Sequence, residues 1–110
     1  MLSLTKVITV IALAAGHTIA FAGDMTYFNP GLGSCGWTNG DGDAIVALST
    51  ARPGNCGRNI RISYGGRSAV ARVVDACPGC SVDSIDVAPY VFDKLANRDQ
   101  GRVHVNWEFV

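Results

Sequence analysis

Alternation of apolar and polar side chains predicts several short β-strands along this chain. The clearest case is residues 58–74, where apolar side chains recur at every second position on both sides of Gly65 and Gly66. Two alternating runs separated by two glycines predict a β-hairpin with strands 58–64 and 67–74. Residues 102–110 alternate in the same way, so we expect the chain to end in a strand.

Shorter runs predict the remaining elements. Residues 25–28, 44–48 and 84–87 are expected as strands, and the Gly-rich, polar segments 31–42 and 49–57 as surface loops. A helix is predicted from residue 88 or 89 to about residue 97, because Pro89 suits the first helical position and Val91, Phe92 and Leu95 form an apolar stripe. Six short strands and one short helix favour an all-β fold, a small closed barrel without exposed sheet edges.

The N-terminus has the pattern of a secretory signal peptide. Lys6 precedes the apolar run 7–15, and Ala20-Phe21-Ala22 is a small-x-small cleavage site, so residues 1–22 are the predicted signal. A membrane anchor is the alternative, but residues 16–18 interrupt a run that is shorter than the roughly 20 apolar residues needed to cross a bilayer. We therefore expect a secreted protein with one domain, residues 23–110.

Charge excludes one class of partner. The predicted mature chain has eight basic and nine acidic residues, and its arginines are scattered rather than clustered. A nucleic-acid binder would show a basic face. We expect no nucleic-acid or membrane partner and a monomer.

Four cysteines remain after the predicted cleavage: Cys35, Cys56, Cys77 and Cys80. An even number in a short secreted chain favours two disulfides, because a core of this size is only marginally stable. A zinc site would need more than the single CxxC motif, and a redox pair would need a βαβ unit around it. Three disulfide pairings are consistent with the sequence.

Two acids lie near apolar residues, Asp75 after an apolar strand and Asp86 between Ile85 and Val87. Burial there would raise a carboxyl pKa toward that of a general acid. Glycoside hydrolysis also requires a second carboxylate, about 5 Å or about 6.5 to 9.5 Å away. The structural alternatives are a helix cap for Asp86 and a turn residue for Asp75.

Other chemistry is limited. His104, the one histidine of the predicted mature chain, lies on the polar side of the last strand, and no metal-site, P-loop or dinucleotide motif is present. We therefore predict no metal and no cofactor. Exposed aromatic rings can stack on sugars, and Trp37, in a Gly-rich loop near Cys35, is the best candidate. The other candidates are Tyr27, Phe28, Tyr64 and Tyr90, whereas Phe92 and Trp107 are expected in the core.

Several blocks of the sequence match a known family. GDMTYFNPGLGSCGWTN, NCGRNIRISYGGRSAVARVVDACPGC, SIDVAPYVFDKLAN and GRVHVNWEFV together resemble the RlpA-like double-psi β-barrel of the barwin, expansin and endoglucanase superfamily. The resemblance covers residues 23–110 and is greatest to single-domain fungal expansin-like proteins of the loosenin type. It implies a six-stranded double-psi β-barrel with one short helix.

The resemblance also implies roles for individual residues. In expansins the acid that matches Asp86 is the one on which wall loosening depends, and the acid that matches Asp75 supports it. Thr26 and Tyr27 match groove residues, and Trp37 and Tyr90 are expected to extend the groove. The implied disulfides are Cys35–Cys56 and Cys77–Cys80.

One departure from the family pattern concerns catalysis. Lytic members have a catalytic base at the end of the first strand, where this chain has Asn29, an amide that cannot accept a proton. We therefore predict a protein that binds cell-wall polysaccharide (cellulose, chitin or a peptidoglycan-like glycan) and loosens it without hydrolysis. The alternatives are a protease inhibitor or elicitor that uses loops 29–39 and 50–55, and a weak endoglucanase or lytic transglycosylase.

Overall fold

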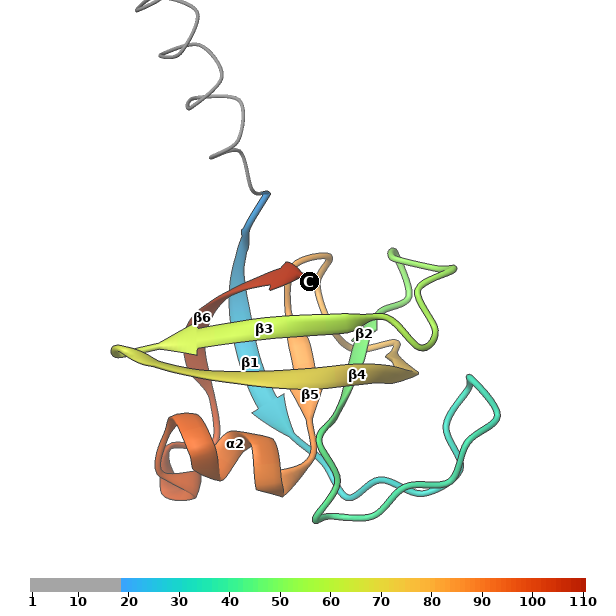
Figure 1. Ribbon diagram of the computed structural model, residues 1–110, viewed down its shortest axis with the longest axis horizontal. Helices are drawn as coiled ribbons and strands as arrows, with labels where there is room; N and C mark the ends of the chain where they lie inside the picture. Colours follow the sequence, from blue (N-terminus) through green and yellow to red (C-terminus); the bar gives the residue numbers. More distant parts are fainter. Residues whose placement is uncertain (1–18) are drawn as a thin grey trace, which may run out of the picture.

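Residues 19–110 fold into a closed six-stranded β-barrel with one α-helix packed beneath it (Figure 1). The computed structural model describes residues 19–110, so most of the predicted signal peptide lies outside the described residues. The strands follow the order β1-β5-β2-β4-β3-β6 around the barrel. Their bounds are Phe21–Tyr27 for β1, Ile45–Ser49 for β2, Asn59–Tyr64 for β3, Arg67–Cys77 for β4, Ile85–Val87 for β5 and Val103–Phe109 for β6.

The barrel contains both parallel and antiparallel strand pairs. β1 pairs in parallel with β5, β2 pairs in parallel with β4, and the other four neighbouring pairs are antiparallel. The predicted hairpin is present as β3 and β4, joined at Gly65 and Gly66, which both have positive φ. The predicted fold class, a small six-stranded double-psi barrel with one short helix and two disulfides, is confirmed.

The core lies inside the barrel and between the barrel and the helix. Side chains from alternate positions of β3, β4 and β6 are buried there, as the sequence pattern predicts. The helix α2, Pro89–Leu95, buries its predicted apolar stripe of Val91, Phe92 and Leu95 against the barrel. Among residues 19–110 no helix is long and apolar enough to cross a membrane.

Some element bounds differ from the prediction. The helix ends at Leu95, two residues early, and Asn97 caps a 3-10 helix, Arg98–Gln100, by accepting a hydrogen bond from the Asp99 N–H. β1 begins four residues earlier than predicted, because Phe21 packs on Trp107 with ring centroids 4.6 Å apart. It therefore starts two residues before the predicted domain boundary at Gly23.

Candidate functional site

Four residues from four adjacent strands form a row on the outer face of the barrel. Thr26 of β1 pairs with Asp86 of β5, and Ala47 of β2 pairs with Asp86 on one side and with Asp75 of β4 on the other. We call Thr26, Asp86, Ala47 and Asp75 the outer row. Because Ala47 separates the two acids, their Cα atoms lie about two strand spacings, or roughly 10 Å, apart.

A β-bulge brings Asp75 into this row. Alternation along β4 directs Ala71 and Val73 into the core and would direct residue 75 inward as well. The register between β2 and β4 shifts after Val46, so that Val74 has no direct partner and Asp75 pairs with Ala47. The extra residue reverses the direction of the side chains that follow it. Asp75 consequently faces outward, and its backbone stays in the ladder.

Asp86 is a half-buried carboxylate in the middle of β5. Its neighbours Ile85 and Val87 point into the core, and the Thr26 hydroxyl donates to its Oδ1 atom at 3.0 Å. Burial raises the pKa of Asp86, while the Thr26 hydrogen bond and the charge of Arg102 act in the opposite direction. Burial is the largest of these effects, so the carboxyl holds its proton more tightly than a free aspartate does.

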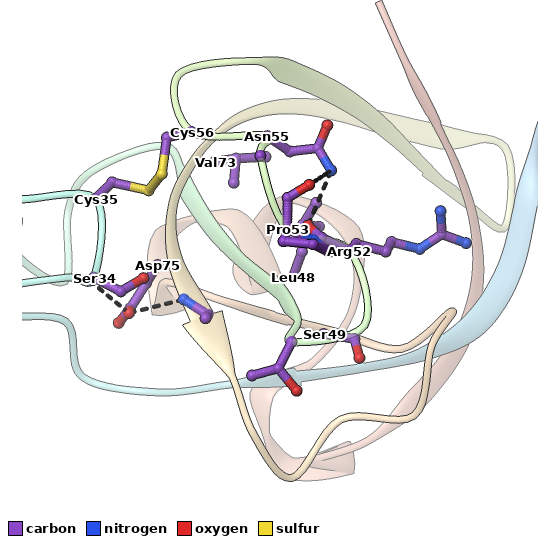
Figure 2. Close-up of a pocket in the computed structure, with 13 residues that line it drawn as sticks. Ser34, Cys35, Leu48, Ser49, Arg52, Pro53, Asn55, Cys56, Val73 and Asp75 are labelled. Atoms are coloured by element: carbon purple, nitrogen blue, oxygen red, sulfur yellow. Dashed lines mark hydrogen bonds between the residues drawn. A yellow bond between two sulfur atoms is a disulfide. The ribbon is translucent and has the colours of Figure 1, made fainter.

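Asp75 is engaged by the backbone instead. Its Oδ1 atom accepts hydrogen bonds from the N–H groups of Ser34 and Ala76, at 2.9 and 2.8 Å (Figure 2). The contact to Ser34 connects the end of β4 to the loop that carries Cys35. Asp75 therefore connects the barrel to that loop. The structural alternative from the sequence, a turn residue, is wrong, because Asp75 lies within β4 and pairs with Ala47.

The cap role considered for Asp86 is not observed. Ala88 is the N-cap of α2 and makes no side-chain cap hydrogen bond. The side-chain hydrogen bond of Asp86 within residues 19–110 is with Thr26. The carboxylate thus contacts Thr26 within the outer row. The helix begins with Pro89, which needs no partner for a backbone N–H.

A cavity of about 260 Å³ lies beside the Asp75 end of the row (Figure 2). Its walls are the end of β2, the Cys35–Cys56 disulfide and the loop between β2 and β3. Arg52 fixes that loop, because its guanidinium pairs with Asp83 at 2.5 Å and lies 3.9 Å from the centroid of the Phe21 ring. The lining includes Leu48, Val73 and Asp75 and is mainly apolar.

A more polar hollow of about 370 Å³ lies at the other end of the row, next to Thr26. Arg102 and Asp24 face each other across it, with Arg102 Nη1 3.2 Å from Asp24 Oδ2. The Cys77–Cys80 segment forms another wall. The remaining lining residues are Gly79, Ser81 and Ser84.

The aromatic candidates are only partly brought together. Trp37 is 38% exposed and stacks on Arg72, which lies on the outer side of β4, so it extends the outer row at the Asp75 end. Tyr27 points to the opposite side of β1 from Thr26 and packs edge-on against Phe92 at 5.0 Å. Tyr90 lies on α2, with Lys94 Nζ 4.7 Å from its ring centroid.

Both disulfides have the pairing that the family resemblance implies, Cys35–Cys56 and Cys77–Cys80. All four cysteines are therefore oxidised, and the four-thiolate zinc alternative is wrong. Asn29 donates through Nδ2 to both carboxylate oxygens of Asp41, each at 3.1 Å. Asn29, which the sequence resemblance matches to the base of lytic family members, is thus an amide whose own partner is a carboxylate.

Sequence reasoning missed two cationic neighbours of the site. Arg102 influences Asp86 and Arg72 supports Trp37, although both look like scattered surface charges in the sequence. Alternation around buried Met25 could have indicated Asp24 as a neighbour of the site, because it places Asp24 on the same face of β1 as Thr26. No local pattern indicates the cross-strand distance to Arg102.

Comparison with curated proteins identifies relatives of this chain. No protein-family model matches the chain. An Asp f 7 allergen homolog of Arthroderma benhamiae is 36% identical over 112 residues, and the match covers 80% of this chain but only 38% of that protein. The papain inhibitor of Streptomyces mobaraensis is 35% identical over 127 residues, covering 98% of this chain and 89% of the inhibitor.

Comparison with solved structures finds proteins with the same fold. The Streptomyces papain inhibitor superimposes with a TM-score of 0.76 at 33% identity, over 84% of this chain and 94% of the inhibitor. A mutant expansin of Clavibacter michiganensis in complex with cellohexaose has a TM-score of 0.77 at 20% identity, over 84% of this chain and 50% of the expansin. The chain therefore belongs to the family of the Streptomyces papain inhibitor, and it shares the double-psi β-barrel fold with the expansin.

Proposed function

We propose that the protein binds cell-wall polysaccharide along the outer row and loosens its packing without cleaving it. The observation that carries this proposal is Asp86, a half-buried carboxyl held by Thr26 and facing outward between two hollows. Such a group can donate or accept a hydrogen bond with a sugar hydroxyl, and Trp37 adds a flat apolar surface at one end. The expansin that shares this fold was solved with cellohexaose, which supports the same ligand class.

Two features support binding without cleavage: the partners of the second acid and the amide at position 29. A hydrolase of the usual kind requires a carboxylate that is free to attack or to activate water. Asp75 uses its Oδ1 atom for two backbone N–H groups, and Asn29 carries no base. We therefore expect the row to bind a glycan and no bond to break.

The direct test is a pull-down with insoluble cellulose, chitin and peptidoglycan. Asp86→Asn should weaken binding about tenfold, the effect of one hydrogen bond to a charged group, at about 1.4 kcal/mol per factor of ten. Asp99→Asn is the matched control, because it removes the same charge from an exposed position outside the row. Equal binding by the wild type and Asp86→Asn would contradict the proposed role.

Hydrolysis is measured on the same samples. Soluble reducing ends should stay at background for the wild type, while the extension of a loaded cellulose strip increases. Release of oligosaccharides that disappears in Asp86→Asn would establish a lytic enzyme instead of a loosening protein.

Protease inhibition is the second candidate function. It is supported by 35% identity to the papain inhibitor across nearly the whole length of both chains. Stoichiometric inhibition of papain that persists in Asp86→Asn would favour it, because the loops 29–39 and 50–55 would then act without the outer row. Loss of glycan binding together with retained inhibition would separate the two functions.

Secretion remains part of the proposal. Both disulfides are consistent with an oxidising compartment. Cleavage after Ala22 would remove Phe21 from β1, whereas cleavage after Ala20 would retain its packing on Trp107. N-terminal sequencing of the exported protein distinguishes Phe21 from Gly23 as the first residue, and recovery of the uncut chain would contradict the signal.

A further inference from the structure

The loop between β1 and β2 presents one strongly exposed apolar side chain. Leu32 is 75% exposed and lies between Gly31 and Gly33, so neighbouring side chains do not cover it. A single exposed leucine has no special meaning by itself. Its significance here depends on how firmly the backbone around it is held.

Backbone hydrogen bonds hold both sides of Leu32. Leu32 forms an isolated antiparallel bridge with Thr38. The Asn39 N–H donates to the Gly31 carbonyl at 3.0 Å, and the Gly33 N–H donates to the Trp37 carbonyl at 2.9 Å. These two bonds flank the Leu32–Thr38 pair, so Leu32 lies in a short extended ribbon.

The barrel fixes this ribbon from below. A Cβ atom added at Gly33 would lie only 2.3 Å from the Val74 carbonyl oxygen, so glycine allows the ribbon to pack directly on β4. The Cys35 N–H donates to the same carbonyl at 3.2 Å, and Ser34 is held by Asp75. The Cys35–Cys56 disulfide completes the attachment. The position of Leu32 is therefore set before any partner binds.

The backbone of Leu32 itself is available. Its N–H and C=O groups make no hydrogen bond with any part of residues 19–110. The hydrogen bonds of the bridge to Thr38 are made by Gly31 and Gly33, the residues on either side of Leu32. An extended segment with free backbone groups and one apolar side chain can pair with a second extended strand and fill a pocket at the same time. Peptide substrates enter a protease cleft in this form.

We propose that Leu32 is the anchor that this chain inserts into the apolar pocket of a papain-type cysteine protease, with its N–H and C=O groups paired to the backbone of the cleft. This inference rests on the second candidate function, protease inhibition. The fixed ribbon loses little conformational entropy on binding, which favours a tight complex.

The test is the inhibition constant for papain, measured with the full folded chain. Leu32→Ala should raise this constant about tenfold or more, since it removes most of a buried leucine side chain, and Leu32→Asp about a hundredfold or more, since it places a charge in the pocket. Leu32→Met should retain most of the inhibition. Val70→Asp is the matched control, because Val70 is also exposed, at 46%, but lies on β4 outside the ribbon.

The outcomes distinguish the anchor from the function. If the wild type leaves papain fully active at stoichiometric concentration, protease inhibition itself is wrong for this enzyme class and the anchor with it. If the wild type inhibits and Leu32→Asp inhibits equally well, the anchor is wrong and the function stands. Urea unfolding of each variant establishes that a lost effect does not come from a lost fold.

Discussion

Asp86 and Asp75 lie on either side of Ala47 in the same outer row, but their carboxylates have different partners. Asp75 accepts two backbone N–H groups, which are fixed by the fold, whereas Asp86 accepts one hydroxyl, which can rotate toward another acceptor. A carboxylate bound to fixed donors maintains local structure. A carboxylate bound to one rotatable donor can exchange that donor for a ligand without disturbing the backbone. The outer row therefore has a structural end and an available end.

Each end also has its own disulfide. Cys35–Cys56 closes a separation of 21 residues and attaches the Leu32 ribbon beside Asp75. Cys77–Cys80 closes a separation of three residues and lines the hollow next to Thr26. The longer bridge joins two loops that are distant in sequence, while the shorter one only shapes a turn. The disulfides thus differ in the same way as the two acids: the one at the structural end joins distant segments, and the one at the available end shapes a single turn.

Removal of the disulfides should give the largest difference between the two ends. The chain-entropy relation predicts a loss of about 3 kcal/mol of unfolding free energy for Cys35→Ala with Cys56→Ala, and about 2 kcal/mol for Cys77→Ala with Cys80→Ala. Urea unfolding of both double variants measures these values. A larger loss at the shorter bridge would reverse the assignment of the structural end.

Asp75→Ala should have the next largest effect. It leaves the N–H groups of Ser34 and Ala76 without an acceptor, which costs about 1 to 3 kcal/mol of unfolding free energy. Hydrogen exchange at these two amides should accelerate, while exchange within β5 should not. Asp75→Asn keeps one acceptor oxygen and should retain most of the stability, and stability equal to wild type in Asp75→Ala would show that water replaces the carboxylate.

Thr26→Val should have a smaller effect on stability and a specific effect on Asp86. Loss of the hydroxyl removes one hydrogen bond, worth about 1 kcal/mol of unfolding free energy. Because that bond lowers the pKa of Asp86, the pKa should rise further in this variant, as measured by NMR titration of the carboxyl carbon. Thr26→Ser keeps the donor and should titrate like the wild type.

Local periodicity explains which parts of this fold the sequence predicts. The alternation in residues 58–74 and 102–110 and the stripe of Val91, Phe92 and Leu95 led to the correct strands and helix, because one face of each element is buried. The double-psi barrel fold and the disulfide pairing came from the family resemblance, since pairing partners distant in sequence leave no local periodic signal. The β1 start was missed because Phe21 looks like part of a cleavage site.

The site was less predictable for a similar reason. Strict alternation would place Asp75 inside the barrel, and only the unpaired Val74 turns it outward. A bulge depends on the register of two strands, which short-range sequence patterns do not encode. Tyr27 illustrates the opposite error, because its neighbour Thr26 belongs to the outer row while Tyr27 itself packs against the helix. A motif of adjacent residues can therefore contribute to two different faces.

The smallest expected effect is the pH dependence contributed by Asp86. Burial raises its pKa in the folded state above the value of 3.8 for a free aspartate. The folded protein then holds this proton more tightly than the unfolded chain, so the stability gained is fully present below pH 3.8 and is lost as the pH rises through the folded-state pKa. Asp86→Asn does not titrate at this position. As the pH rises from about 3 to about 7, the unfolding free energy of Asp86→Asn should therefore increase relative to that of the wild type.

Asp43→Asn provides the control with the opposite sign. The Gly40 N–H and the Asn39 side chain lower the pKa of the exposed Asp43 carboxyl, so its contribution is present above pH 3.8 and is lost as the pH falls. The difference between wild type and Asp43→Asn should therefore grow with pH in favour of the wild type. If both variants followed the wild type across the same range, the Asp86 carboxyl would be as well solvated in the folded protein as in the unfolded chain, and the contrast between the two ends of the row would rest on their hydrogen bonds alone.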